Sequence, residues 1–132
     1  MVKMIPAVMD MLKRPDTNKV LVTISPEGDP HGIVCGSLLV VDEETIIAGE
    51  VYMYRTRDNL EHNSKAEFLV WSGKNAYSIQ AKATSCTESG HLLDKININL
   101  EKMKMKADAV WEFKVIAVYD ESVSGMAGTR II

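Results

Sequence analysis

Two arginines and a threonine stand together in the segment Tyr54-Arg55-Thr56-Arg57, shortly after a β-rich stretch. The pattern predicts that a short helix begins here, with Thr56 as its N-cap. Free backbone N–H groups, the positive end of the helix dipole and the two guanidinium groups would together attract an anion. The segment is therefore a candidate cradle for a phosphate group. In the alternative reading, Thr56 only caps the helix and both arginines are solvated.

The composition is that of an ordinary globular protein. A chain of 132 residues is long enough to bury one core, so we expect a single domain over residues 1–132. The formal net charge of -3 offers no basic excess that would favour nucleic acid. The longest apolar runs are too short to cross a bilayer, and the N-terminus lacks a signal-peptide pattern. We therefore expect a cytoplasmic location, with neither nucleic acid nor a membrane as a partner.

The remaining reactive side chains show no spacing typical of a catalytic or metal site. Cys35 and Cys86 match no metal-ligand spacing and are expected to be buried thiols without a disulfide. His62 and His91 share no ligand spacing with a cysteine or a carboxylate pair, so no metal site is expected. Local spacing assembles no Ser-His-Asp, Cys-His or paired-carboxylate arrangement. The catalytic residues, if there are any, are therefore unknown.

The pattern of apolar and turn residues predicts a mainly β chain with a few short helices. The helices are expected near residues 2–12, 56–64 and 90–106. The segment over residues 124–130 is rich in small residues and is expected to be flexible. Closure of the sheet into a barrel would remove its exposed edges. Six strands are expected, at residues 20–24, 31–41, 45–49, 66–71, 77–87 and 110–119.

Several short motifs follow one another in a suggestive order: Gly28-Asp29-Pro30-His31 in a hairpin turn, Tyr54-Arg55-Thr56, Asn59-Leu60-Glu61-His62-Asn63, Phe68-Leu69-Val70-Trp71, and Ser78-Ile79-Gln80-Ala81-Lys82-Ala83. In this order the chain resembles the FMN-binding split-barrel proteins related to pyridoxamine 5'-phosphate oxidase, and among them the small FMN-binding proteins. The resemblance covers roughly residues 5 to 130. It implies a six-stranded antiparallel split barrel that forms a homodimer, with two FMN sites at the subunit interface.

The resemblance also implies which residues contact the cofactor. Arg55 and Thr56 match the pair that holds the FMN phosphate, in agreement with the charge argument above. The strand end formed by Val51, Tyr52, Met53 and Tyr54 matches the backbone that runs beside the isoalloxazine ring. Cofactor-facing positions on the second strand are matched by Val34, Cys35 and Gly36. Relatives often carry Asn or Thr and an aromatic residue there, so this chain lacks a polar contact, and Gly36 would leave space for the ring.

Two further polar residues are compatible with either a binding role or a structural role. Asn59 and Gln80 are each positioned, by the resemblance, to add a hydrogen bond to the cofactor. Either could equally serve the fold. Trp71 and Trp111 lie on strand patterns and are expected to pack in the core or an interface.

The identity of the cofactor does not by itself define the reaction. The leading hypothesis is a small FMN-dependent oxidoreductase or electron carrier, with a redox protein or a nicotinamide as the electron donor. The alternative is a non-catalytic module that binds flavin, deazaflavin or haem, and a third reading is a barrel without a cofactor. Pyridoxamine 5'-phosphate oxidase activity itself is not expected, because those enzymes carry a C-terminal segment with Arg and His, whereas this chain ends Ala127-Gly128-Thr129-Arg130-Ile131-Ile132.

Overall fold

The structure, a computed structural model, describes all 132 residues and is dominated by one antiparallel sheet with three short helices. No helix is long and apolar enough to cross a membrane. The helices are α1 (Pro6–Lys13), α2 (Tyr54–His62) and α3 (His91–Glu101). The strands are β1 (Asn18–Ile24), β2 (Pro30–Val34), β3 (Leu38–Asp42), β4 (Thr45–Gly49), β5 (Lys65–Ser72), β6 (Asn75–Thr87), β7 (Val110–Asp120) and β8 (Thr129–Arg130).

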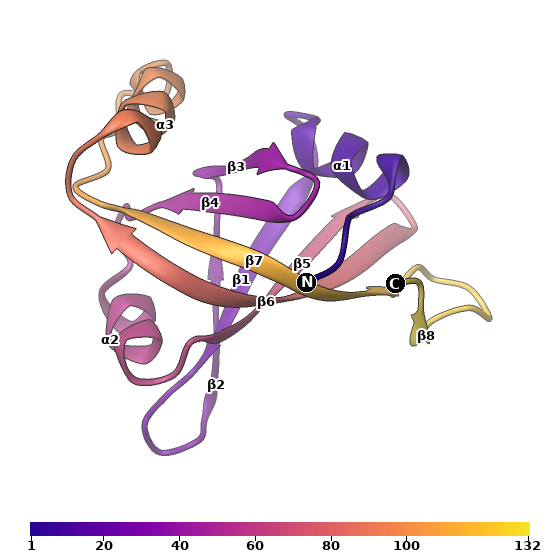
Figure 1. The fold of residues 1–132 in the computed structure, drawn as a ribbon. Helices are drawn as coiled ribbons and strands as arrows, with labels where there is room; N and C mark the ends of the chain where they lie inside the picture. Colours follow the sequence, from indigo (N-terminus) through magenta and orange to yellow (C-terminus); the bar gives the residue numbers. More distant parts are fainter.

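The sheet runs in the order β2-β1-β5-β6-β7-β4-β3, and β8 pairs with β7 outside this path. Its two end strands, β2 and β3, are consecutive in the sequence, and the sheet therefore curves so that its two ends approach each other. No ladder of hydrogen bonds joins β2 to β3. The long strands β6 and β7 form the middle of the curved sheet (Figure 1). The arrangement is that of a split barrel, with the opening between β2 and β3.

The predicted strand over residues 31–41 is wrong as a single element. The structure divides it at Cys35-Gly36-Ser37, where the chain changes neighbours. The N–H of Cys35 still donates to the carbonyl of Lys19 on β1 (2.9 Å), but the carbonyl of Ser37 accepts from the N–H of Gly49, at the end of β4 (3.1 Å). With this division and the short β8, the chain has eight strands rather than six.

The barrel interior is filled by side chains from both halves of the sheet. Phe68 on β5 and Phe113 on β7 meet edge to face at its centre, with ring centroids 5.0 Å apart. Helix α1 adds Val8, Met11 and Leu12 to this core. Such aromatic contacts and burial of aliphatic side chains are the main stabilising contributions in a domain of this size.

A second, smaller core lies at the other end of the barrel. Helix α3 places Leu93, Ile96 and Leu100 against Ile47 of β4 and Val110 of β7. Figure 1 shows α3 and α2 at the same end of the sheet, where β4 ends and β7 begins. These two helices therefore frame the region in which the sequence places its site.

The last two residues of the chain, which follow the tail predicted over residues 124–130, are held against the sheet. The N–H of Ile131 donates to the carbonyl of Val118 (2.8 Å), and the N–H of Val118 donates to the carbonyl of Ile132 (3.0 Å). Ile131 and Ile132 also pack on the main core. The tail thus extends the hydrogen bonding of β7 beyond β8.

Candidate functional site

The site is built where β4 runs into α2, and the helix begins earlier than the sequence pattern predicts. Its first residue is Tyr54, and Met53 occupies the N-cap position without a side-chain capping bond. Thr56 is the third helical residue, so its prediction as the N-cap is wrong. The backbone turns into the helix at Tyr52, which adopts a φ of 54°. This left-handed conformation is uncommon for a residue other than glycine.

The start of α2 presents free backbone donors. The first helical hydrogen bond runs from the N–H of Arg57 to the carbonyl of Met53 (2.8 Å). The preceding N–H groups, of Tyr54, Arg55 and Thr56, have no acceptor in the protein. Unpaired N–H groups in the first turn of a helix, together with its dipole, are a suitable surface for an anion.

The two arginines of the segment have different surroundings. Arg55 is exposed and makes no hydrogen bond or ion pair, so its guanidinium is available to a ligand. Arg57 is held by three carboxylates, those of Glu50 (2.7 Å), Glu61 (3.0 Å) and Glu88 (3.7 Å). Hydrogen bonds to Glu61 and Glu50 raise the pKa of Arg57 above its ordinary value. Of the two charges that the sequence suggested, only Arg55 is therefore free.

Glu50 is the carboxylate that fixes this arrangement. It lies on the short connection between β4 and α2, and its side chain is only 11% exposed. One oxygen accepts from Arg57, and the other accepts from the indole N–H of Trp111 on β7 (3.0 Å). The charge of a mostly buried carboxylate is thereby compensated by a cation and a polar donor. Trp111 is mostly buried, in line with the expected packing role.

The side chain of Thr56 is fully buried, and its hydroxyl is an unpaired polar atom. Only one other buried side-chain oxygen, that of Thr17, shares this condition. A buried hydroxyl without a partner costs free energy, and such groups are rare in native proteins. Thr56 therefore combines an unpaired buried hydroxyl with one of the free backbone N–H groups of the first helical turn.

The second predicted segment lies beside the first. Ser37 Oγ donates to the carbonyl of Gly49 (2.6 Å), which brings residues 34–36 next to the end of β4. Val34 is 78% exposed and Gly36 is exposed, so both offer surface to a ligand. Cys35 is fully buried, and this burial raises the pKa of its thiol to about 11. The Cys35 side chain therefore offers no surface to a ligand, and only its backbone remains as a contact.

The structure places Asn59 and Gln80 in different surroundings. Asn59 is buried in α2 and donates to the hydroxyl of Thr23 on β1 (3.0 Å), which ties the helix to the sheet. Gln80 is exposed on β6 and lines a groove of about 430 Å³. None of the residues that line this groove belongs to residues 34–36 or 51–56. Within one chain, Gln80 is therefore not brought together with the other site residues.

A neighbouring cavity was not foreseen from the sequence. It has a volume of about 310 Å³ and lies between the start of α2 and the connection from α3 to β7. Its walls include Val51, Tyr52, Met53 and Tyr54, all of which the resemblance assigns to the cofactor, and Arg57 of the predicted cradle. They also include residues that were assigned no role: Glu50, Lys104, Met105, Lys106 and Asp108. Residues 104–108 lie about 50 positions after residues 51–54 in the sequence, so no local spacing could have joined these two segments.

Comparison with known proteins agrees with this architecture. Residues 5–122 match the family model described as pyridoxamine 5'-phosphate oxidase. A search among curated proteins gave no match.

Among solved structures, the fold is similar to an FMN-binding protein from Syntrophomonas wolfei, with a TM-score of 0.81 and 16% identity over 88% of this chain and 84% of that one. HupZ from Group A Streptococcus has a TM-score of 0.80 and 21% identity over 95% of this chain and 100% of that one. An F420 reductase has a TM-score of 0.68 and 15% identity over 83% of this chain and 93% of that one. The family match, which spans most of the chain, confirms the resemblance seen in the motifs: the chain belongs to the pyridoxamine 5'-phosphate oxidase family.

Proposed function

We propose that this chain binds FMN and acts as a small oxidoreductase or electron carrier. The phosphate would lie at the start of α2, on Arg55 and the free N–H groups of the first turn. The ring would lie beside the backbone of Val51–Tyr54 and over the opening at Val34–Gly36. Family membership and the similar fold of an FMN-binding protein support the choice of ligand.

One observation carries this proposal. The start of α2 combines three N–H groups without acceptors, an unpaired guanidinium on Arg55 and the partnerless buried hydroxyl of Thr56. A phosphate group carries several strong acceptor oxygens and a negative charge, and it would accept from the free N–H groups and pair with the Arg55 guanidinium at once. The residues present therefore fit the phosphate end of FMN.

The chain's own side chains would bind and orient the cofactor rather than react. FMN, when bound, supplies the capacity to accept and give electrons. The Cys35 thiol is protonated at neutral pH, as an ordinary thiol is, and its burial raises its pKa further, to about 11. Glu50 and Arg57 neutralise each other beneath the start of α2. We assign no residue as an acid or base, and a redox protein or a nicotinamide remains the proposed electron donor.

We also propose that two copies of the chain form the working unit. The groove around Gln80 on the outer face of the sheet is lined mainly by apolar residues, including Val22, Ile24 and Ile116. An exposed apolar surface of this kind suits contact with a second copy. Such a copy would bring its own Gln80 to the cofactor of its partner, which a single chain does not do.

The first experiment is a titration of the purified protein with FMN, followed by absorption and by size-exclusion chromatography with light scattering. We expect close to one FMN for each chain and a particle of two chains. Retention of no flavin after incubation with excess FMN and desalting would overturn the cofactor assignment. A flavin-loaded monomer would overturn the two-copy site while leaving flavin binding intact.

A non-catalytic binding module for flavin, deazaflavin or haem is the second candidate. It is favoured by one observation: the residues assigned to the cofactor provide no carboxylate or histidine that could serve as an acid or base. The similarity to the fold of an F420 reductase keeps a deazaflavin among the ligands to test. Stopped-flow mixing of the FMN-loaded protein with NADH, with NADPH and with a reduced redox protein separates the two candidates. Rapid bleaching of the flavin bands by any of these donors supports an oxidoreductase or electron carrier, whereas indifference to all of them favours the binding module.

A further inference from the structure

Glu67 is a half-buried carboxylate on the outer face of the sheet. The next residue on β5, Phe68, points into the core, so the Glu67 side chain lies on the other side of the strand. Its direct neighbours across the strands are Val22 on β1 and Gln80 on β6. All three line the groove of about 430 Å³ that we assign to contact with a second copy. An acidic group therefore lies inside the proposed interface.

A second carboxylate lies on the same face. Glu121 follows directly after β7, and one of its oxygens accepts a hydrogen bond from the hydroxyl of Ser78 (3.2 Å). Ser78 is two residues before Gln80 on β6, which makes it a diagonal neighbour of Glu67 across the β5–β6 ladder. Burial and the nearby charge of Glu121 raise the pKa of Glu67 above its ordinary value.

No cation is paired with either carboxylate, because every ion pair in the structure is formed by Arg57. The lysines of this face stand in one row across three strands. Lys65 at the start of β5 pairs in register with Lys82 on β6, and Lys82 pairs with Lys114 on β7. Lys65 and Lys82 are exposed, and Lys114 donates to the hydroxyl of Thr45. The row therefore leaves the acid pair without a partner.

Apolar side chains and one phenol complete the surroundings of Glu67. β1 supplies Val22 and Ile24 to the groove, and β7 supplies Ile116. The phenol is that of Tyr119, further along β7. A carboxylate among apolar neighbours keeps its charge only at a cost in free energy.

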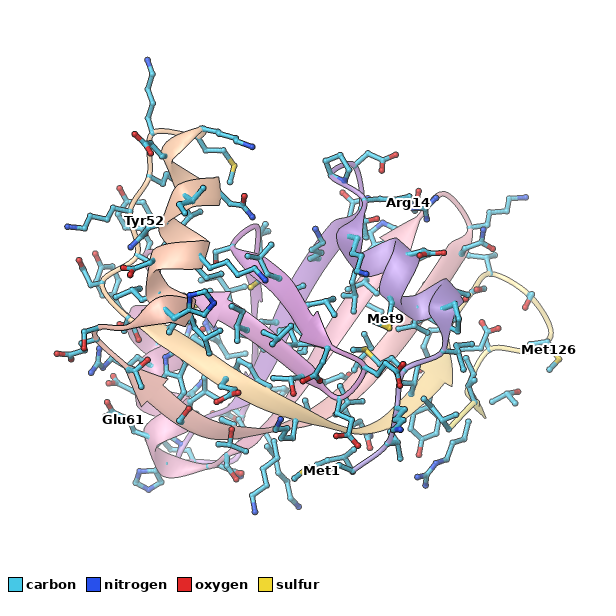
Figure 2. All side chains as sticks on the ribbon, turned by 45° about the horizontal axis from the view of Figure 1, so that its top comes forward. Met1, Met9, Arg14, Tyr52, Glu61 and Met126 are labelled. Carbon is cyan, nitrogen blue, oxygen red and sulfur yellow. The ribbon has the colours of Figure 1, made fainter.

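The carboxylates around Arg57 belong to another part of the molecule. Glu61 lies on α2, whereas Glu121 begins the loop that carries Met126. Figure 2 shows Glu61 and Met126 at opposite ends of the sheet. Glu121 is therefore the carboxylate that acts on Glu67.

A second copy on this face would bury the acid pair more deeply. In a two-fold contact the same surface of each copy meets the other, so each copy adds its own two carboxylates to the interface. The loss of water and the approach of further negative charge both favour a protonated acid. Association of two copies would therefore take up protons.

We propose that Glu67 and Glu121 form an acid pair that makes assembly of the two-copy unit depend on pH, a role that rests on the two copies proposed above. Association raises the pKa of Glu67 beyond its value in the free chain. As the pH falls through the pKa in the assembled unit, Glu67 takes up a proton and the contact tightens, until the free chain is protonated as well. Acidification thereby favours the unit in which Gln80 reaches the partner's flavin.

The dissociation constant of the two-copy unit, measured between about pH 5 and pH 8, tests this role. Sedimentation velocity with fluorescence detection gives the constant, with FMN in excess. Where the unit is too tight to dissociate, the dependence of the urea midpoint on protein concentration gives the same constant. We expect the Kd to fall roughly tenfold or more from pH 8 to pH 5, because each unit of added pKa shift is worth up to a factor of ten for each carboxyl group.

Three variants identify the responsible group, and circular dichroism reports whether each is folded. Glu67→Gln should lower the Kd at pH 8 roughly tenfold and remove most of its pH dependence, since no charge remains to be buried. Glu121→Gln keeps Glu67 and should remove only part of it. Glu101→Gln is the matched control, because Glu101 is exposed on α3, outside the groove. It should behave as the native chain. The phosphate of FMN also titrates in this range, so the proteins are compared at each pH.

The possible outcomes separate the acid pair from the two-copy unit. A Kd that does not change with pH, or a pH dependence that persists in Glu67→Gln, would overturn the acid pair and leave the two-copy unit intact. A contact that weakens on acidification would show that Glu67 pairs with a cation of the second copy, which is the opposite role. Equal effects of Glu67→Gln and Glu101→Gln would reduce the result to overall charge. A single chain at every pH and concentration would instead overturn the two-copy unit itself.

Discussion

Ser37 and Gly49 are joined by two hydrogen bonds, one in each direction. The hydroxyl of Ser37 donates to the carbonyl of Gly49 at 2.6 Å, and the N–H of Gly49 donates to the carbonyl of Ser37 at 3.1 Å. Ser37 is nearly buried at this point, so the pair is shielded from water. The contact fixes the opening at residues 34–36 against the end of β4. Both segments assigned to the flavin ring depend on it.

Gly49→Ala should destabilise the protein. A Cβ atom at this position would lie 2.5 Å from Cγ2 of Ile96 and 3.1 Å from Cβ of Ala107, so the packing of Ile96 against β4 would have to shift. We expect a loss of about 1–3 kcal/mol in the free energy of unfolding, as for other overpacked sites. Chemical denaturation followed by tryptophan fluorescence measures it. Gly36→Ala is the matched control, because a Cβ there meets nothing within 4 Å; equal losses in both variants would contradict the packing argument.

Arg55→Ala should weaken FMN binding much more than riboflavin binding. The guanidinium has no partner in the protein, so its removal takes away a contact to the phosphate without breaking one in the fold. A charge-assisted contact is worth about 1.5–3 kcal/mol, roughly a ten- to hundredfold change in Kd. Quenching of flavin fluorescence measures both ligands.

Arg14→Ala provides the control for overall charge, since Arg14 is exposed at the end of α1, away from the proposed site. It should leave both affinities unchanged. If Arg55→Ala weakened FMN and riboflavin equally, Arg55 would act on the ring or the fold, and the phosphate assignment would be wrong.

Gly36→Leu tests the ring side of the site. The space around Gly36 is open, so a larger side chain should fold there but project over the surface assigned to the ring. We expect FMN and riboflavin to weaken together, by about tenfold or more, as a clash of 1–3 kcal/mol implies. The combination of this result with the selective loss in Arg55→Ala would separate the two ends of the cofactor. Undiminished binding of both flavins would place the ring elsewhere.

Cys35 should make the stability of the protein fall at alkaline pH. Burial raises the pKa of its thiol from 9.0 to about 11. Between these values the unfolded chain has lost this proton while the native state retains it, so the free energy of unfolding decreases as the pH rises. Below about pH 9 the protonated thiol makes its full contribution to the free energy of unfolding. By pH 11 the free energy of unfolding has decreased by about 2–3 kcal/mol through this group.

The measurement is urea denaturation of the native protein and of Cys35→Ala from pH 8 to pH 11. Tyrosines and lysines also titrate in this range, so the difference between the two proteins is the relevant quantity. It should shrink as the pH rises. A difference that is independent of pH would show that Cys35 titrates alike in the folded and unfolded states.

Asn59→Ala should act on stability, because the Asn59 amide donates to the buried hydroxyl of Thr23. Loss of the donor leaves this hydroxyl without a partner, and we expect a cost of about 1–3 kcal/mol in the free energy of unfolding. Thr23→Val in the same background should recover part of it, since it removes the orphaned group. An unchanged stability together with weakened FMN binding would instead assign Asn59 to the cofactor.

The elements that the sequence predicts well are those with a strong local pattern. Helix α1 covers most of the predicted range, although it begins at Pro6 and not near residue 2, and it ends before Pro15. The hairpin of β5 and β6 turns at Ser72–Asn75, where the turn residues are. The division of residues 31–41 was missed because the change of neighbour from β1 to β4 depends on pairing between distant strands. A continuous apolar run contains no local sequence signal for a change of the neighbouring strand.

The candidate site shows the same contrast. Arg55 is exposed near the start of α2, although it lies in the first turn and not before the helix, as a Thr56 N-cap would have placed it. The N-cap at Thr56 was wrong because the positive φ of Tyr52 starts the helix earlier, and nothing in the residue type announces it. The pairing of Arg57 with Glu61 was within reach, since residues four apart on a helix are neighbours. Its pairing with Glu50 and Glu88 was not.

The position of β4 between β3 and β7 also bears on how the protein is made. β4 pairs on one edge with β3, which lies only a few residues earlier in the sequence. Its other edge pairs with residues 110–114 of β7, which follow more than 60 positions later. During synthesis from the N-terminus, this edge stays unpaired until most of the chain has emerged, and an unpaired edge is a site of aggregation. The contact of Glu50 with Trp111, which sets the base of α2, forms only after that same event. The proposed flavin site therefore cannot be completed before β7 has emerged, and a nascent chain that stops before β7 exposes an apolar edge without it.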